Sequence, residues 1–144
     1  MRLKEVAMKK FGILIVAAAA GSCTMAPPAP SPAQYAEAQA KFTQLTAGKV
    51  AGAPQNCLTP LEANDMVIID DGTVAFKYGN GRVYINHMEG GGCPGIDGGY
   101  NTLVTKSPAG QLCRGDIASV VDLRSRMPAG SCVFGDFIPY TRVG

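Results

Sequence analysis

Three patterns of apolar and polar residues follow one another along the chain. An apolar run near the start gives way to helical spacing over residues 32–47, and then to alternation with period two from Lys49 onward. Turn dipeptides separate the alternating stretches. These patterns predict one helix and a set of short strands, which form a single globular domain over residues 31–144 with its β part at 49–142.

The apolar run is typical of a bacterial lipoprotein signal peptide. Phe11–Ala20 contains ten uncharged residues after Lys9 and Lys10, half of the ~20 that a membrane-spanning helix needs. Small residues then precede Cys23, as at the processing site of lipoproteins. We expect residues 1–22 to be the signal peptide and Cys23 to be lipidated. The alternative is ordinary secretion, with Cys23 removed or left as a thiol.

The residues around this signal refine the expectation. Translation is expected to begin at Met8, because Glu5 lies in an otherwise positive segment before it. Residues 23–30 form a Pro/Ala spacer that favours extended polyproline II and would hold a domain about 20 Å from a lipid surface. Thr24 stands where an aspartate would favour the inner membrane, so the likeness to lipoproteins implies the outer membrane. A soluble periplasmic or secreted protein is the alternative location.

The net charge of the chain becomes slightly negative when the predicted signal peptide is left out. The whole chain has a formal charge of +2, but the mature chain after residue 22 keeps nine basic and ten acidic residues. Nucleic-acid binding needs a clustered basic face, so we expect no nucleic-acid partner. The 18 glycines and ten prolines favour a turn-rich β fold.

Residues 31–48 carry the signals of one amphipathic helix. Ser31, Pro32 and Gln34 suit the N-cap, the first helical position and a capping box, and Gly48 suits the position after the helix end. The apolar stripe of this helix comprises Tyr35, Ala38, Phe42 and Leu45. We expect the stripe to dock on the domain's own sheet; a partner-binding or dimerising helix is the alternative.

Turn dipeptides predict a three-stranded antiparallel meander. Asp71-Gly72 and Asn80-Gly81 are strong hairpin signals. They separate three β-rich runs, at Asp65–Asp70, Thr73–Tyr78 and Arg82–Met88.

Shorter strands are expected in the second half of the chain. Pro108-Ala109-Gly110 is predicted to join Asn101–Lys106 to Gln111–Cys113 in a hairpin. The remaining strands are Ile117–Leu123 and Ser131–Tyr140, with the polar loop Arg124–Gly130 between them. Pro139 places the last strand at a sheet edge or ends it. The fold class is therefore α+β, mainly β: a small antiparallel barrel or sandwich of six to seven short strands with one N-terminal helix.

Glycines 90, 92 and 95 have the spacing of a dinucleotide-binding loop. Pro94 and the residues after it lead toward a strand and not into a helix, so we expect a connector and no cofactor. Two of the acidic residues suit structural roles, Asp71 in its turn and Asp116 as a backbone cap. Arg124-Ser125-Arg126 could meet an anionic headgroup or a peptidoglycan carboxylate, although a solvated loop is the default.

His87 is the only histidine of the chain, with Glu89 and Asp97 near it in sequence. One nitrogen ligand and no free thiol make a poor transition-metal site, so a structural histidine is expected. No G-x-S-x-G motif occurs. We therefore expect no catalytic, cofactor-binding or metal-binding residue.

Four further cysteines predict a disulfide framework, since an even number in an exported chain is typical of one. The predicted meander places Cys57 and Cys93 at opposite ends of its strands, about 17 Å apart. Cys132 is expected beside the far end of the strand that follows Cys113. A disulfide needs Cα atoms within about 7 Å, so both sequential pairings are disfavoured. We expect Cys57–Cys113 and Cys93–Cys132.

Four segments carry a resemblance to a known group. They are Asn56-Cys57-Leu58, Cys93-Pro94-Gly95-Ile96, Leu112-Cys113-Arg114-Gly115-Asp116-Ile117 and Cys132-Val133-Phe134-Gly135-Asp136-Phe137-Ile138-Pro139-Tyr140. The chain resembles the small, uncharacterised envelope proteins of Gram-negative bacteria that are classed as domains of unknown function. The resemblance implies a signal peptide, often of the lipoprotein kind, and a compact β-rich domain. It implies no activity, ligand or catalytic residue.

The sequence thus favours a non-enzymatic lipoprotein that is anchored at Cys23, faces the periplasm and acts as a structural or interaction module. Its expected partners are the membrane and an envelope protein that the sequence does not identify. The alternative is a small-ligand or metal-binding domain that uses the glycine-rich loop 89–100 near His87.

Overall fold

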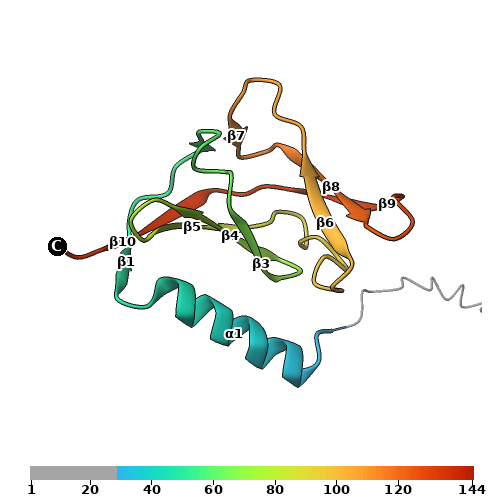
Figure 1. The fold of residues 1–144 in the computed structure, drawn as a ribbon, viewed down its shortest axis with the longest axis horizontal. Coiled ribbons are helices and arrows are strands. Elements are labelled where there is room, and N and C mark those ends of the chain that lie inside the picture. Colours follow the sequence, from blue (N-terminus) through green and yellow to red (C-terminus); the bar gives the residue numbers. More distant parts are fainter. Residues whose placement is uncertain (1–28) are drawn as a thin grey trace, which may run out of the picture.

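The computed structural model describes residues 29–144, in which ten strands and one helix are present (Figure 1). The predicted signal peptide and Cys23 lie outside these residues. In chain order the elements are α1 (Pro32–Thr46), β1 (Lys49–Ala51), β2 (Cys57–Leu58), β3 (Met66–Asp70), β4 (Thr73–Tyr78), β5 (Arg82–His87), β6 (Asn101–Thr105), β7 (Leu112–Cys113), β8 (Ile117–Asp122), β9 (Pro128–Val133) and β10 (Phe137–Arg142).

The strands form three antiparallel sheets, of which the largest lies in the middle of the molecule. Its order is β1-β10-β5-β4-β3, and the others are β6-β8-β9 and the short pair β2-β7. The mainly β class with one helix and two disulfides is confirmed. The large sheet begins at β1 and ends at β3 without closing, so the barrel alternative is not found. The expected number of strands was too low, because β1 and β2 are only three and two residues long and one predicted strand is two strands, β9 and β10.

The large sheet is covered on both faces. Alternate side chains of β4 and β5 point to opposite faces. On one face Ala75, Val83 and Ile85 pack with Ala38 of α1. The core on the other face joins β4 and β5 to the three-stranded sheet through Val74, Phe76, Tyr84, Leu103, Ala118 and Val120. The molecule therefore has three layers: helix, large sheet and small sheet.

Helix α1 begins and ends nearly as expected. The capping box is present: Gln34 N donates to Ser31 Oγ at 3.3 Å, and Ser31 N donates to Gln34 Oε1 at 2.8 Å. The helix ends at Thr46, and Gly48 has a φ of 67°. Ala38 is buried, and Phe42 and Leu45 pack against the same cluster, so most of the stripe docks on the sheet as expected.

Tyr35 departs from that prediction, because its side chain is 61% exposed. It lies in the first turn of α1 beside the β3–β4 turn, where it lines a cleft instead of packing on the sheet.

The predicted meander is confirmed. Strands β3, β4 and β5 pair antiparallel, with Val67 opposite Ala75 and Ala75 opposite Ile85. Both turns that join them have the dipeptides that predicted them, and Gly81 has a φ of 82°.

The predicted hairpin around Pro108-Ala109-Gly110 is wrong. Strand β6 pairs with β8, with Leu103 opposite Val120, and β7 pairs with β2, with Cys57 opposite Cys113. Residues 106–111 form a loop too long to fix a register, unlike a two-residue turn. Strands β6 and β7 therefore do not pair with each other, and each pairs with a strand more distant in sequence.

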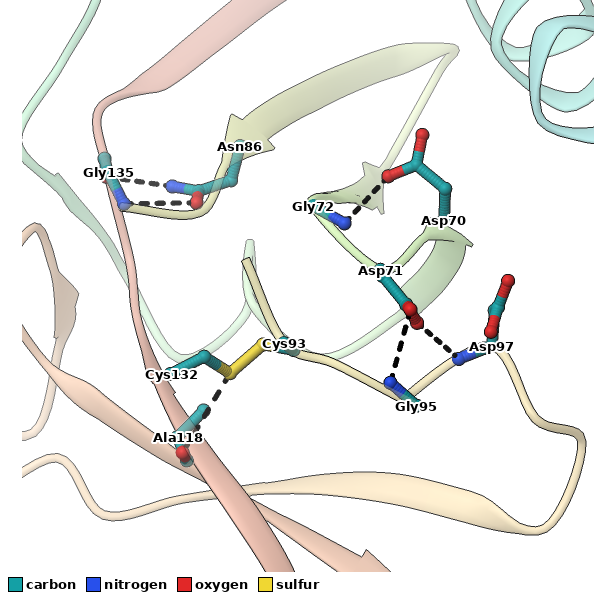
Figure 2. The surroundings of a disulfide bond; sticks show 10 residues. All are labelled: Asp70, Asp71, Gly72, Asn86, Cys93, Gly95, Asp97, Ala118, Cys132 and Gly135. Carbon is teal, nitrogen blue, oxygen red and sulfur yellow. Dashed lines mark hydrogen bonds between the residues drawn. A yellow bond between two sulfur atoms is a disulfide. The ribbon is translucent and has the colours of Figure 1, made fainter. Parts of the chain in front are cut away.

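The predicted strand Ser131–Tyr140 is two strands in different sheets. Its first part is the end of β9, which begins at Pro128 inside the expected loop, and its last part belongs to β10. The chain crosses between the sheets at Gly135, which the buried side chain of Asn86 holds. Asn86 Nδ2 donates to Gly135 O at 2.7 Å, and Gly135 N donates to Asn86 Oδ1 at 3.1 Å (Figure 2).

Pro139 is neither at an edge nor at a strand end, since β10 lies between β1 and β5 and continues to Arg142. Its carbonyl accepts a hydrogen bond from Gly52 N at 2.7 Å. In an antiparallel ladder the N–H and C=O of one residue point to the same side. The missing N–H therefore faces Gly52, which follows the end of β1 and is exposed to solvent.

Candidate functional site

Two disulfides join the four cysteines of the described domain. Cys57 is bonded to Cys113 with Cα atoms 4.0 Å apart, and Cys93 to Cys132 with Cα atoms 5.1 Å apart. This is the pairing expected from the sequence, but the expected position of Cys132 was wrong. Cys132 lies opposite Ala118 near the start of β8, and not beside its far end.

The Cys93–Cys132 disulfide fixes the glycine-rich loop to the small sheet. Cys93 is 1% exposed and Cys132 is 4% exposed, so the disulfide lies within the core. Cys93 N also donates to Asp71 O at 2.5 Å. A Cβ on Gly92 would lie 2.9 Å from the Gly72 Cα, so only glycine allows this close approach. The loop is therefore held against the β3–β4 turn.

A cleft of about 770 Å³ opens where this loop, the β3–β4 turn and the first turn of α1 meet. Apolar and aromatic groups form one part of its wall and three carboxylates form another. Its lining residues are Ala29, Pro30, Gln34, Tyr35, Ala38, Asp70, Asp71, Gly72, Pro94, Gly95 and Asp97.

Backbone amides orient the carboxylates of the cleft (Figure 2). Asp71 Oδ2 accepts from Gly95 N at 3.1 Å, and Asp71 Oδ1 accepts from Asp97 N at 3.2 Å. Asp70 Oδ1 accepts from Gly72 N at 2.8 Å. Asp71 thus acts as more than a turn residue, since it also organises the loop after Cys93.

The cleft carries an electrostatic cost that a cation would relieve. Burial raises the pKa of Asp97, and the hydrogen bond and charge of Asp71 raise this pKa further. Ionised Asp97 is therefore disfavoured beside Asp71, and an ammonium or guanidinium group near both would stabilise it. The arrangement suits a positively charged group carried on an apolar or extended segment.

The residues proposed around His87 are not brought together. His87 Nδ1 lies 3.4 Å from Thr73 Oγ1, in a separate hollow that also contains Asp70. Glu89 accepts from Arg114 Nε at 2.9 Å, whereas Asp97 lies beside Asp71. Within residues 29–144, no group of three or more His, Cys, Asp or Glu side chains could hold a metal ion.

Two smaller predictions about loops are confirmed. The glycine string at 90, 92 and 95 enters turns and no helix, so it is a connector. Asp116 caps the backbone, because its Oδ2 accepts from Cys113 N at 2.8 Å. The cleft itself could not be predicted from the sequence, because its walls come from segments near residues 35, 71 and 95 that no local pattern connects.

The fold and the cleft define a mainly β, disulfide-linked domain with one acidic cleft among its described hollows. Comparison with protein-family models, curated proteins and solved structures finds no match. In the described residues, no helix is long and apolar enough to cross a membrane.

Proposed function

We propose that this protein is a lipoprotein of the cell envelope, anchored at Cys23 and facing the periplasm, that acts by binding and not by catalysis. The observation that carries this proposal is the pair of disulfides. Disulfides form and persist in oxidising compartments and are rare in the cytosol. The disulfides therefore support export, which the signal-like segment and the resemblance to envelope proteins also imply. For the architecture of the domain we propose a sandwich of two packed sheets.

The cleft is the proposed place of binding. A site of this size with an exposed aromatic ring, two prolines and three carboxylates suits a lysine or arginine side chain on an extended segment of a partner protein. Tyr35 would contact the apolar part of that segment, and Asp71 and Asp97 would receive its charge. Binding would weaken on acidification, because protonation of Asp97 near its raised pKa removes one of the negative charges.

A small cationic molecule is the second candidate ligand. The volume of about 770 Å³ lies within the range of small-molecule sites. The glycine-rich loop would then contribute Pro94 and Gly95, as the sequence suggested, whereas His87 would lie in the neighbouring hollow beyond Asp70.

Cell fractionation tests the anchor. The unaltered protein should sediment with outer membranes, and Cys23→Ala should release it into the soluble periplasm. Ser22→Ala is the matched control, since it keeps a small residue before the cysteine and should leave the protein in membranes. If Cys23→Ala stays with membranes, the anchor proposal is wrong.

Titration with short peptides tests the cleft. Trilysine should shift the NMR signals of Tyr35 and of residues 94–97, and trialanine should not. Asp71→Asn with Asp97→Asn should abolish the shifts, while Glu37→Gln, an exposed acid on α1 that pairs with Lys41, should preserve them. If Glu37→Gln abolishes the trilysine-induced NMR shifts as fully as the double cleft variant does, binding at a specific site is contradicted. Native mass spectrometry of the purified protein would distinguish a retained small molecule from a protein partner.

A further inference from the structure

We propose that the turn between β8 and β9 contacts an anionic phospholipid surface, the surface from which the protein is tethered. This inference rests on the proposed lipid anchor. The turn projects two large apolar side chains, Leu123 at 59% and Met127 at 64% exposed, beside Arg124 and Arg126. Apolar side chains beside cations are the combination that binds the interface of an anionic membrane.

The backbone of this turn is fixed from within. Asp122 Oδ1 accepts from Arg124 N and from Ser125 N, each at 2.8 Å, and Asp122 N donates to Met127 O at 3.0 Å. Arg126 adopts a φ of 59°, which turns the chain back into β9. With its backbone satisfied internally, the turn presents its side chains outward.

The two arginines are available to an external anion. Hydrogen bonds from the Ser125 and Arg124 amides lower the pKa of Asp122, so its carboxylate stays ionised and engaged with the backbone. In the part of the chain that the structure describes, neither Arg124 nor Arg126 forms an ion pair. The Arg124 guanidinium lies 3.3 Å from the ring centre of Tyr100, itself 50% exposed. Arg and Tyr both join an apolar body to a polar tip, as residues at membrane interfaces do.

The turn lies at the end of the molecule where the chain enters the domain. Ala29 and Pro30 border the cleft with Gly95, whose carbonyl accepts from Asn101 Nδ2 at 2.7 Å. The neighbouring Tyr100 carbonyl accepts from Leu123 N at 2.8 Å. Along the long axis of the molecule, the start of α1 and the β8–β9 turn lie toward one end and the C-terminus at the other (Figure 1). A spacer of about 20 Å after Cys23 sets the farthest distance of the start of α1 from the membrane, so this turn, at the same end, can reach the surface.

Tryptophan fluorescence tests the contact, because the chain contains no tryptophan. Met127→Trp places a single reporter on the turn, and Val143→Trp places a matched one at the opposite end, at a site that is 72% exposed. The processed, lipidated protein is incorporated into phosphatidylcholine vesicles with about 30 mol% phosphatidylglycerol, with and without brominated acyl chains. The reporter at position 127 should be blue-shifted and quenched about twofold more than the one at 143.

The anionic component is tested in two ways. Vesicles of phosphatidylcholine alone should reduce the excess quenching at position 127, and so should Arg124→Gln with Arg126→Gln. Equal quenching of the two reporters, or quenching that ignores the anionic lipid, would overturn the proposal while leaving the anchor intact. If neither variant remains with the vesicles, the anchor fails and the membrane contact fails with it. Contact with a protein instead of lipid predicts no quenching at either position.

Discussion

The large and small sheets differ in how many of their faces are covered. In β5 four successive residues, Val83 to Asn86, are buried, because α1 covers one face and the small sheet the other. In β8 only Ala118 and Val120 are buried, while Ile117 is 61% exposed. A sheet that is covered on both faces takes much of its stability from packing. Only one face of the small sheet is covered by packing, so its stability depends more on the Cys93–Cys132 disulfide.

Removal of each disulfide in turn should give the largest effect. Loops of 56 and 39 residues predict a loss of about 4 kcal/mol for either disulfide in the chain-entropy model. Cys93→Ala with Cys132→Ala should cost more than Cys57→Ala with Cys113→Ala, because the first pair is also buried core between the sheets. Urea unfolding measures both. An equal or reversed order would contradict the special dependence of the small sheet on its disulfide.

Truncation of one phenylalanine in the core on each side of the large sheet should give the next largest loss of stability. Phe137 is fully buried against Phe76 and Phe134, so Phe137→Ala should cost about 3–5 kcal/mol. Phe42 is half-buried and touches Tyr140 from α1, so Phe42→Ala should cost less, about 1–2 kcal/mol. If Phe137→Ala does not fold, Phe137→Leu replaces it. A larger loss at Phe42 would show that the helix side dominates.

A third prediction concerns the segment between β2 and β3. A hydrogen bond from Tyr84 of the large sheet fixes this segment in place. Tyr84 Oη donates to Glu62 Oε1 at 2.5 Å, and this bond lowers the pKa of Glu62 from its usual 4.5. Stability from this contact is therefore present above pH 4.5 and lost as the pH falls through the lowered value. Tyr84→Phe should cost about 1 kcal/mol at pH 7 and flatten the acid limb of the stability profile. If Tyr84→Phe loses stability on acidification as steeply as the unaltered protein does, the contribution of this contact is contradicted.

The smallest effect is expected on the outer face of the small sheet. Val104→Thr and Ile117→Thr alter side chains that are 45% and 61% exposed, so each should change the free energy of unfolding by under about 0.5 kcal/mol. Val120→Thr, on the covered face of the same sheet, is the matched control and should cost clearly more. A large loss at Val104 or Ile117 would show that a second surface covers this face in solution.

Local signals predicted the parts of the fold that local interactions build. The capping box at Ser31 and the turn at Asn80-Gly81 each act within a few residues, and both are confirmed. The pairing of β6 with β8 and of β7 with β2 depends on contacts between distant segments, which no turn dipeptide encodes. The cleft could not be predicted for the same reason, since Asp71 and Asp97 are 26 residues apart.

The most direct test of an anchored, disulfide-linked envelope protein is mass spectrometry of unreduced peptides from the protein purified out of cells. We expect an N-terminal peptide that begins at Cys23 with the added mass of its acyl chains. We also expect linked peptides that join Cys57 to Cys113 and Cys93 to Cys132. An N-terminus elsewhere with no lipid would contradict the anchor, and four cysteines that alkylate as free thiols would contradict the oxidising compartment.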